Sequence, residues 1–217
     1  MGEIERRALP LDLIELRQDG DSPRSVSWYP ALFDTLSVDL GGFRERISRR
    51  AFTETLKAHD IPALINHDRT QILGRTSKGS LKLSVDLRGL QALTSIPDTT
   101  YARDLIANLE NGNINGGSFA FLPTRDSWKM ENVEGEQEPV LVRTVHEARL
   151  FDVSLVTMPA YPATEDSASL RSLADEWRAK LTEPAPVVPP VPAIAPDLSR
   201  YRRQLDLIKR RWHTCQL

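Results

Sequence analysis

Apolar and polar residues alternate in short runs through much of the chain between residues 24 and 162. The clearest run is LKLSVDL, from Leu81 to Leu87, where every second side chain is apolar. Such alternation predicts a β-strand with one buried face, and Arg88-Gly89 predicts a hairpin turn into a following strand, LQALTSI. Further strands are expected over Ser25–Phe33, Ile61–Ile65, Ser118–Leu122, Asp126–Glu131, Val140–Val145 and Leu150–Thr157.

Three segments show helical spacing instead. Ser48–Ala58 carries Phe52 and Leu56 on one face, and Thr164–Leu181 repeats leucine and tryptophan at intervals of three or four. The third begins at Pro97-Asp98, where the aspartate can cap it, and ends at Gly112. Many short strands with few helices predict an α+β fold that is mainly β, built as a closed or partly closed β-barrel with peripheral helices.

The composition changes sharply near residue 183. Residues 183–197 begin EPAPVVPPVPAIAP, a proline-rich linker of polyproline type. Residues 198–217 carry apolar side chains at helical spacing with arginines between them, which predicts a basic amphipathic helix. This helix is either a docking element for an acidic or apolar partner or a simple tail. We therefore divide the chain into an extension (1–23), a main domain (24–182), the linker and the C-terminal helix.

Charge and cysteine content exclude several classes of protein. A formal net charge of −2 argues against a surface devoted to nucleic acid, and no apolar run approaches the ~18 residues of a membrane span. The N-terminal stretch mixes charges among its apolar residues, unlike a signal peptide. The single cysteine, Cys215, excludes an intrachain disulfide framework and a cysteine zinc cluster. An intracellular setting is expected.

A serine follows a pair of glycines in NGNINGGSFAFLPTR. Glycine in a strand often marks a close approach of backbone to another group. The backbone N–H groups around Gly117 and Phe119 could therefore polarise a reacting carbonyl beside Ser118. Alternatively, Ser118 only begins a strand after a glycine turn.

A serine nucleophile needs a base, and four histidines are candidates: His59, His67, His146 and His213. His67 stands out because it follows the apolar run Ile61–Ile65, so that a strand end would hold it over an open site. Imidazole titrates near neutrality, which suits a general base. The alternative is a surface loop histidine.

The group that would orient such a base lies in TVHEARLFDVS, from Thr144 to Ser154. On one regular strand, Glu147 and Asp152 would face opposite sides, so only one could reach His67. His146 shares a face with Asp152 and is a third option. The pattern leaves this choice open.

Several segments in this order resemble the prohead serine protease family of tailed bacteriophages and related gene-transfer particles. They are ALFDTLSVDLGGFRERISRRAF, NHDRTQILGRT, the helix DTTYARDL, NGGSFAF and VRTVHEARLFDVSLVTMPAYP, and together they span roughly residues 25 to 165. The family's fold is similar to the herpesvirus assemblin protease, which implies an assemblin-like β-barrel. The resemblance implies His67 as base and Ser118 as nucleophile, and it points to Glu147 or Asp152 as the third member.

The sequence departs from the family pattern at Gly117, where methionine is common, at His146, where an aliphatic residue is common, and at Asp152, where glutamate is usual. Because aspartate is one methylene shorter, we favour Glu147 as the third member and keep Asp152 as the alternative. The resemblance also suggests an arginine at the oxyanion, with Arg149 and Arg143 as candidates beside the N–H groups of Gly117 and Phe119.

The resemblance implies a serine endopeptidase without metal or organic cofactor. Its substrates would be the major capsid protein precursor, scaffold segments and the protease itself, inside the assembling prohead in the host bacterial cytoplasm. Self-association is expected, and neither nucleic acid nor a membrane is an expected partner. The main rival is a non-catalytic capsid assembly or scaffolding protein. A metal-dependent hydrolase built on His67-Asp68 and His146-Glu147 is a weaker rival, since no HExxH motif occurs.

Overall fold

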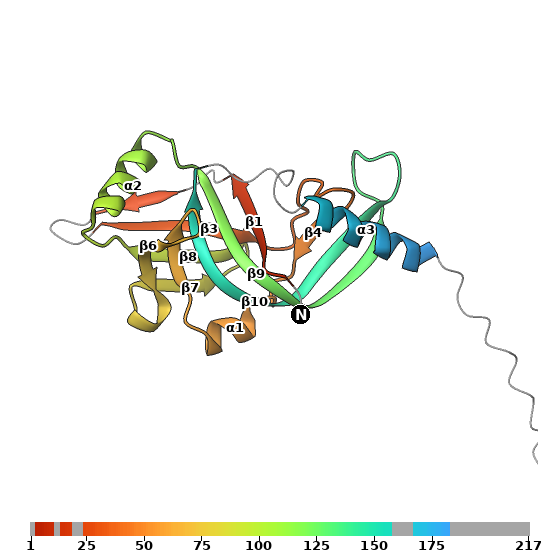
Figure 1. Cartoon of the computed structure of the whole chain (residues 1–217), viewed down its shortest axis with the longest axis horizontal. Coiled ribbons are helices and arrows are strands. Elements are labelled where there is room, and N and C mark those ends of the chain that lie inside the picture. Colours follow the sequence, from red (N-terminus) through yellow and green to blue (C-terminus); the bar gives the residue numbers. More distant parts are fainter. Residues whose placement is uncertain (1–2, 11–13, 19–23, 158–166, 183–217) are drawn as a thin grey trace, which may run out of the picture. The chain divides into compact units, whose positions relative to one another are not determined.

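Two long antiparallel strands, β9 (Gly116–Glu131) and β10 (Val140–Val156), lie in the middle of the larger of two β-sheets (Figure 1). The structure is a computed structural model that describes residues 3–10, 14–18, 24–157 and 167–182. Residues up to Thr182 form one compact unit. The expectations for the linker (183–197) and the C-terminal helix (198–217) lie outside the described residues.

The larger sheet has six strands in the order β1-β9-β10-β5-β6, with β4 also paired to β10. β1 (Glu5–Pro10) is antiparallel to β9, whereas β4 (Arg44–Ile47) and β5 (Pro62–Ile65) both run parallel to β10 along different parts of its length. β6 (Asp68–Arg75) forms a hairpin with β5 and closes the order at that edge.

The smaller sheet has four strands in the order β2-β3-β8-β7. They are β2 (Glu15–Arg17), β3 (Ser25–Leu32), β7 (Leu81–Val85) and β8 (Gly89–Ser95), and every pair is antiparallel. A short 3₁₀ turn, Thr76–Lys78, lies between β6 and β7. The predicted hairpin at Arg88-Gly89 is confirmed, because Val85 pairs with Leu90 across it.

Burial of apolar side chains from both sheets forms the main core. Trp28, Phe52, Phe119, Phe121 and Leu150 lie in this core and are at most 2% exposed. The helices α1 (Thr53–Ala58) and α2 (Thr100–Glu110) add side chains to it. Burial of each such side chain stabilises the fold by roughly 1.5–3 kcal/mol.

A second, smaller core lies where α3 (Ser167–Thr182) packs against the far part of β9 and β10 (Figure 1). Trp177 of the helix stacks on Trp128 of β9, with ring centroids 5.6 Å apart. This contact anchors α3 to the sheet.

The expectation of a mainly β fold with few helices is confirmed. The closed barrel is not found among the described residues, which form two separate sheets. Four predicted short strands are two long ones, because register shifts between β9 and β10, with extra residues in both strands, interrupt the alternation that sequence patterns detect. Asp98 does not cap α2, whose N-cap is Thr99; it pairs with Arg103 instead.

Candidate active site

His67 lies at the tip of the β5–β6 hairpin, in a two-residue turn with Asn66. Both residues have positive φ angles, 49° for Asn66 and 57° for His67. This is the left-handed pairing of a type I′ turn, which matches the twist of the flanking strands. The N–H of Asn66 donates to the carbonyl of Leu155, and its side-chain oxygen accepts from the N–H of Thr157. Both bonds tie the histidine turn to β10.

Ser118 lies near the start of β9, opposite Ser154 of β10. Its side chain points away from the main core, because its neighbour Phe119 points into it. Oγ of Ser118 lies 2.6 Å from Nε2 of His67, although 51 positions separate the two residues. The predicted serine and histidine therefore meet within proton-transfer distance.

The carboxylate beside His67 belongs to Asp152. Its Oδ1 lies 2.6 Å from Nδ1 of the histidine. The same oxygen accepts a hydrogen bond of 3.0 Å from the hydroxyl of Ser154, a fully buried residue of the same strand. Sequence reasoning missed Ser154, although its spacing of two from Asp152 placed both on one face. Asp152, His67 and Ser118 thus form a continuous hydrogen-bonded chain.

The structure does not place Glu147, the preferred third member, beside His67. Its carboxylate accepts two hydrogen bonds from Arg125, and its side chain is 51% exposed. A bulge between Leu150 and Asp152 shifts the alternation of β10, so that Asp152 and Glu147 share a face. Five residues of strand still separate them, about 16 Å. Asp152 reaches the histidine despite its shorter side chain because β5, which leads to the turn, pairs directly with this part of β10.

Strand β1 covers Ser118. Ala8 pairs with Ser118 and Arg7 with Phe119, and the hydroxyl of Ser118 donates to the carbonyl of Arg7 at 2.9 Å. Ser118 is consequently only 2% exposed. A hydroxyl has one proton to donate, so the Arg7 carbonyl and His67 are alternative acceptors for the proton of Ser118. The carbonyl of β1 therefore competes with His67 for this proton.

Arg7 is also held through its side chain, in an ionic cluster made of Glu5, Arg7, Glu45, Asp126 and Arg143. Glu45 accepts from Nε and Nη2 of Arg7 at 2.9 and 3.2 Å, and Arg143 contacts all three carboxylates. Burial lowers the pKa of both arginines, but the carboxylates of Glu45 and Glu5 outweigh burial and raise each pKa above its ordinary value. Both guanidinium groups are thus firmly charged.

The sequence matches the family of caudovirus prohead serine proteases over residues 12–177. This chain belongs to that family. Among curated proteins, none matches it. Among solved structures, it is similar to the capsid assembly protease of bacteriophage T4 with a TM-score of 0.50 and 13% identity, over 71% of this chain and 97% of the other. At that identity the likeness concerns the fold alone. The matched family region begins after β1, so the strand over the serine lies outside it.

Neither of the two candidate arginines, Arg149 and Arg143, lies at Ser118. The guanidinium of Arg149 lies over the ring of Phe151, 5.0 Å from its centroid. Arg143 belongs to the ionic cluster and lies 5.4 Å over the ring of Trp128. The expectation of an arginine at the oxyanion is therefore not met by these two. Gly117 and Phe119, the proposed backbone donors, lie in β9 between β1 and β10.

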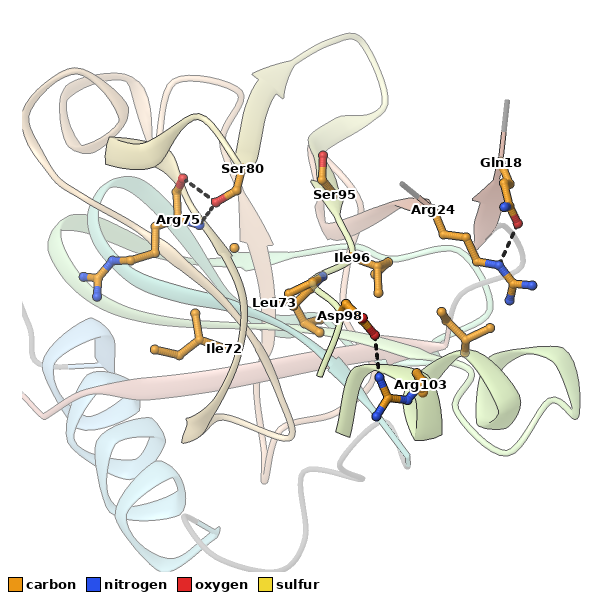
Figure 2. A pocket seen from close by; sticks show the side chains of 13 residues that line it. Gln18, Arg24, Ile72, Leu73, Arg75, Ser80, Ser95, Ile96, Asp98 and Arg103 are labelled. Atoms are coloured by element: carbon orange, nitrogen blue, oxygen red, sulfur yellow. Dashed lines mark hydrogen bonds and ion pairs between the residues drawn. The ribbon is translucent and has the colours of Figure 1, made fainter. Parts of the chain in front are cut away.

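A cavity of about 960 Å³ lies apart from the serine and histidine, with side chains from β6, β8 and α2 (Figure 2). Ile72, Leu73 and Ile96 give it an apolar lining. Its arginines are engaged: Figure 2 shows Arg24 with Gln18 and Arg103 with Asp98. Neither Ser118 nor His67 lines this cavity.

A metal-dependent hydrolase would use the pairs His67-Asp68 and His146-Glu147, but these side chains make hydrogen bonds to other residues. Asp68 accepts from Thr70 and Gln71, and His146 lies 2.8 Å from the hydroxyl of Ser127. In the described ranges, no group of three or more histidine, cysteine or acidic residues is arranged to hold a metal ion. The same ranges contain no helix long and apolar enough to cross a membrane.

Proposed function

We propose that this chain is a serine endopeptidase that cleaves scaffold and capsid-precursor segments, and itself, during prohead maturation. The observation that carries the proposal is the Asp152–His67–Ser118 hydrogen-bonded chain, with both distances at 2.6 Å, in a member of a serine protease family. The family's name also supports a place inside the assembling prohead, with capsid and scaffold chains as partners. Association between copies of the protease is a further part of the proposal. An assemblin-like arrangement of the sheets belongs to the same proposal.

The chemistry would follow the usual course of acyl transfer. His67 takes the proton of Ser118, whose Oγ attacks the peptide carbonyl, and Asp152 stabilises the imidazolium that forms. N–H groups of Gly117 and Phe119 would stabilise the oxyanion. His67 then gives the proton to the leaving amine, and water hydrolyses the acyl-enzyme in the same manner.

Self-cleavage is supported by the position of β1. The peptide bond whose carbonyl contacts Ser118 joins Arg7 to Ala8. Cleavage there would release the first seven residues and free the serine to interact with His67 alone.

The test is co-expression with a major capsid protein precursor, comparing the wild-type chain with Ser118→Ala by intact-mass measurement. A protease shortens the coat protein, whereas Ser118→Ala does not, although it still folds and co-assembles. The rival scaffolding function predicts identical masses with both chains. Identical masses would therefore refute the proposal, and a shortened coat protein only with the wild type would refute the rival.

A further inference from the structure

Strand β1 lies on β9 as an extended peptide would lie on the strand that bears the nucleophile. Six consecutive residues, Glu5–Pro10, pair antiparallel with Gly116–Phe121. Addition of a strand to a sheet edge is a common way to bind a peptide, with the backbone giving affinity and alternate side chains giving specificity. The carbonyl of Arg7 is at the serine, so Arg7 is the residue before the bond that would be cut.

The side chain of Arg7 occupies a position built for a guanidinium. The carboxylate of Glu45 meets it with both oxygens, at 2.9 and 3.2 Å, and Glu45 is only 3% exposed. The guanidinium also lies over the ring of Phe121, 5.5 Å from its centroid. A two-pronged carboxylate contact combined with an aromatic face favours arginine over lysine, whose ammonium is a point charge.

Two residues earlier, Glu5 meets a matching positive charge. Residues i and i+2 of a strand share a face, so Glu5 and Arg7 point the same way. Both carboxylate oxygens of Glu5 accept from Nη1 of Arg143, at 3.0 and 2.9 Å. Arg143 is 4% exposed and is fixed from the other side by Asp126 at 2.7 Å.

Departure of β1 would leave these charges without their partners. The remaining cluster would contain two carboxylates, Glu45 and Asp126, and one guanidinium, Arg143. It would therefore carry an excess negative charge. A buried charge that loses its partner is strongly unfavourable. The vacated groove therefore favours a segment that brings a guanidinium to Glu45 and a carboxylate to Arg143.

We propose that the groove filled by β1 is the substrate site, and that Glu45 and Arg143 make this enzyme select segments of the form Glu-x-Arg and cut after the arginine. This specificity rests on the proposed endopeptidase function. Oγ of Ser118 forms a bond to the arginine carbonyl carbon, the C–N bond to the next residue breaks, and His67 transfers the serine proton to the departing amine. Water then releases the arginine carboxylate and restores the serine.

The test is an unbiased peptide library, made by cutting a denatured proteome after aromatic residues so that arginine stays internal. The full-length wild-type chain and Ser118→Ala are each incubated with it, and new termini are identified by mass spectrometry. We expect arginine immediately before the cut to be enriched at least tenfold over its abundance, with glutamate or aspartate enriched two positions earlier. Acidic or apolar residues before the cut, without arginine enrichment, would overturn the proposal. This arm needs no folded variant of the groove.

Glu45→Gln then tests the residue itself, because the amide keeps the shape and removes the charge. We expect the preference for arginine over other residues immediately before the cut to fall at least fivefold; an intact preference would reject the role of Glu45. Glu131→Gln, at a half-buried glutamate that pairs with Arg46, is the matched control. Coat protein cut at sites without arginine would reject only the specificity, whereas failure to cut coat protein and library alike would reject the proposed function as well.

Discussion

Ser154 and His67 contact the same carboxylate oxygen: the hydroxyl of Ser154 donates to Oδ1 of Asp152, which also lies 2.6 Å from Nδ1 of His67. The backbone N–H of His67 in turn lies 3.3 Å from Oγ of Ser154. Ser154 thus holds both the carboxylate of Asp152 and the turn that carries His67.

Ser154→Ala should lower kcat roughly tenfold and leave KM nearly unchanged. A hydrogen bond to a charged group contributes about 1.5–3 kcal/mol, and about 1.4 kcal/mol of lost transition-state stabilisation is a factor of ten. Steady-state kinetics on a peptide substrate measure this. Ser84→Ala, an exposed serine of β7, is the control. An increase in KM alone would contradict a positioning role.

Asp152→Asn and Glu147→Gln should differ sharply. The amide at position 152 can hold the histidine in the wrong tautomer, which lowers kcat by a factor on the order of 10⁴ in such triads. Glu147→Gln removes one exposed ion pair, which contributes less than about 1 kcal/mol to stability, and kcat should stay within about twofold. Equal losses of kcat in the two variants would show that Asp152 contributes no more to the reaction than the exposed Glu147.

Local pattern made Ser118 and His67 candidates, because Ser118 heads an alternating run and His67 follows a short apolar one. The resemblance to the protease family then singled them out, and the structure brings the two side chains together. The choice between Glu147 and Asp152 could not be made from the sequence, because it depends on bulges in β10 that a two-residue period cannot show. Strand β1 was missed for another reason. Its inward face is Glu5, Arg7 and Leu9, so ionic contacts hold it where a sequence pattern expects apolar burial.

Thr55→Val should destabilise the protein by about 1–3 kcal/mol, because it leaves a buried N–H without an acceptor. The hydroxyl of Thr55 accepts from the N–H of Leu150 at 3.1 Å, beside the bulge that turns Asp152 toward His67. Denaturant unfolding measures the change. Thr53→Val, at an exposed position of the same helix, should change stability little. Equal effects of both substitutions would exclude this role for the hydroxyl.

Asp86→Asn should destabilise the protein near neutrality, with a gap to the wild type that closes in acid. The hydroxyl of Tyr29, 2.6 Å away, and the backbone N–H groups of Gly89 and Arg88 lower the pKa of Asp86 below its ordinary 3.8. A lowered folded-state pKa gives stability that is complete above the unfolded-state pKa and is lost as the pH falls through the folded-state value. The gap should stay below about 1 kcal/mol, because the carboxylate is exposed.

Thermal unfolding from about pH 7 down to about pH 3 measures that gap. Tyr29→Phe removes the principal donor to Asp86, so stability should fall less between neutral and acid pH than in the wild type, as it should in Asp86→Asn. A gap between wild type and Asp86→Asn that widens as the pH falls would show that the carboxylate is not stabilised in its charged form.

The covalent connection between β1 and the strand it covers has a kinetic consequence. A segment tethered to its own binding groove acts at an effective concentration in the millimolar range. A dilute peptide would therefore compete poorly for the groove, and half-occupancy would need a peptide concentration near that range. Chains confined together at comparable density compete on equal terms, so crowding in a closed compartment would itself set how often another segment replaces β1.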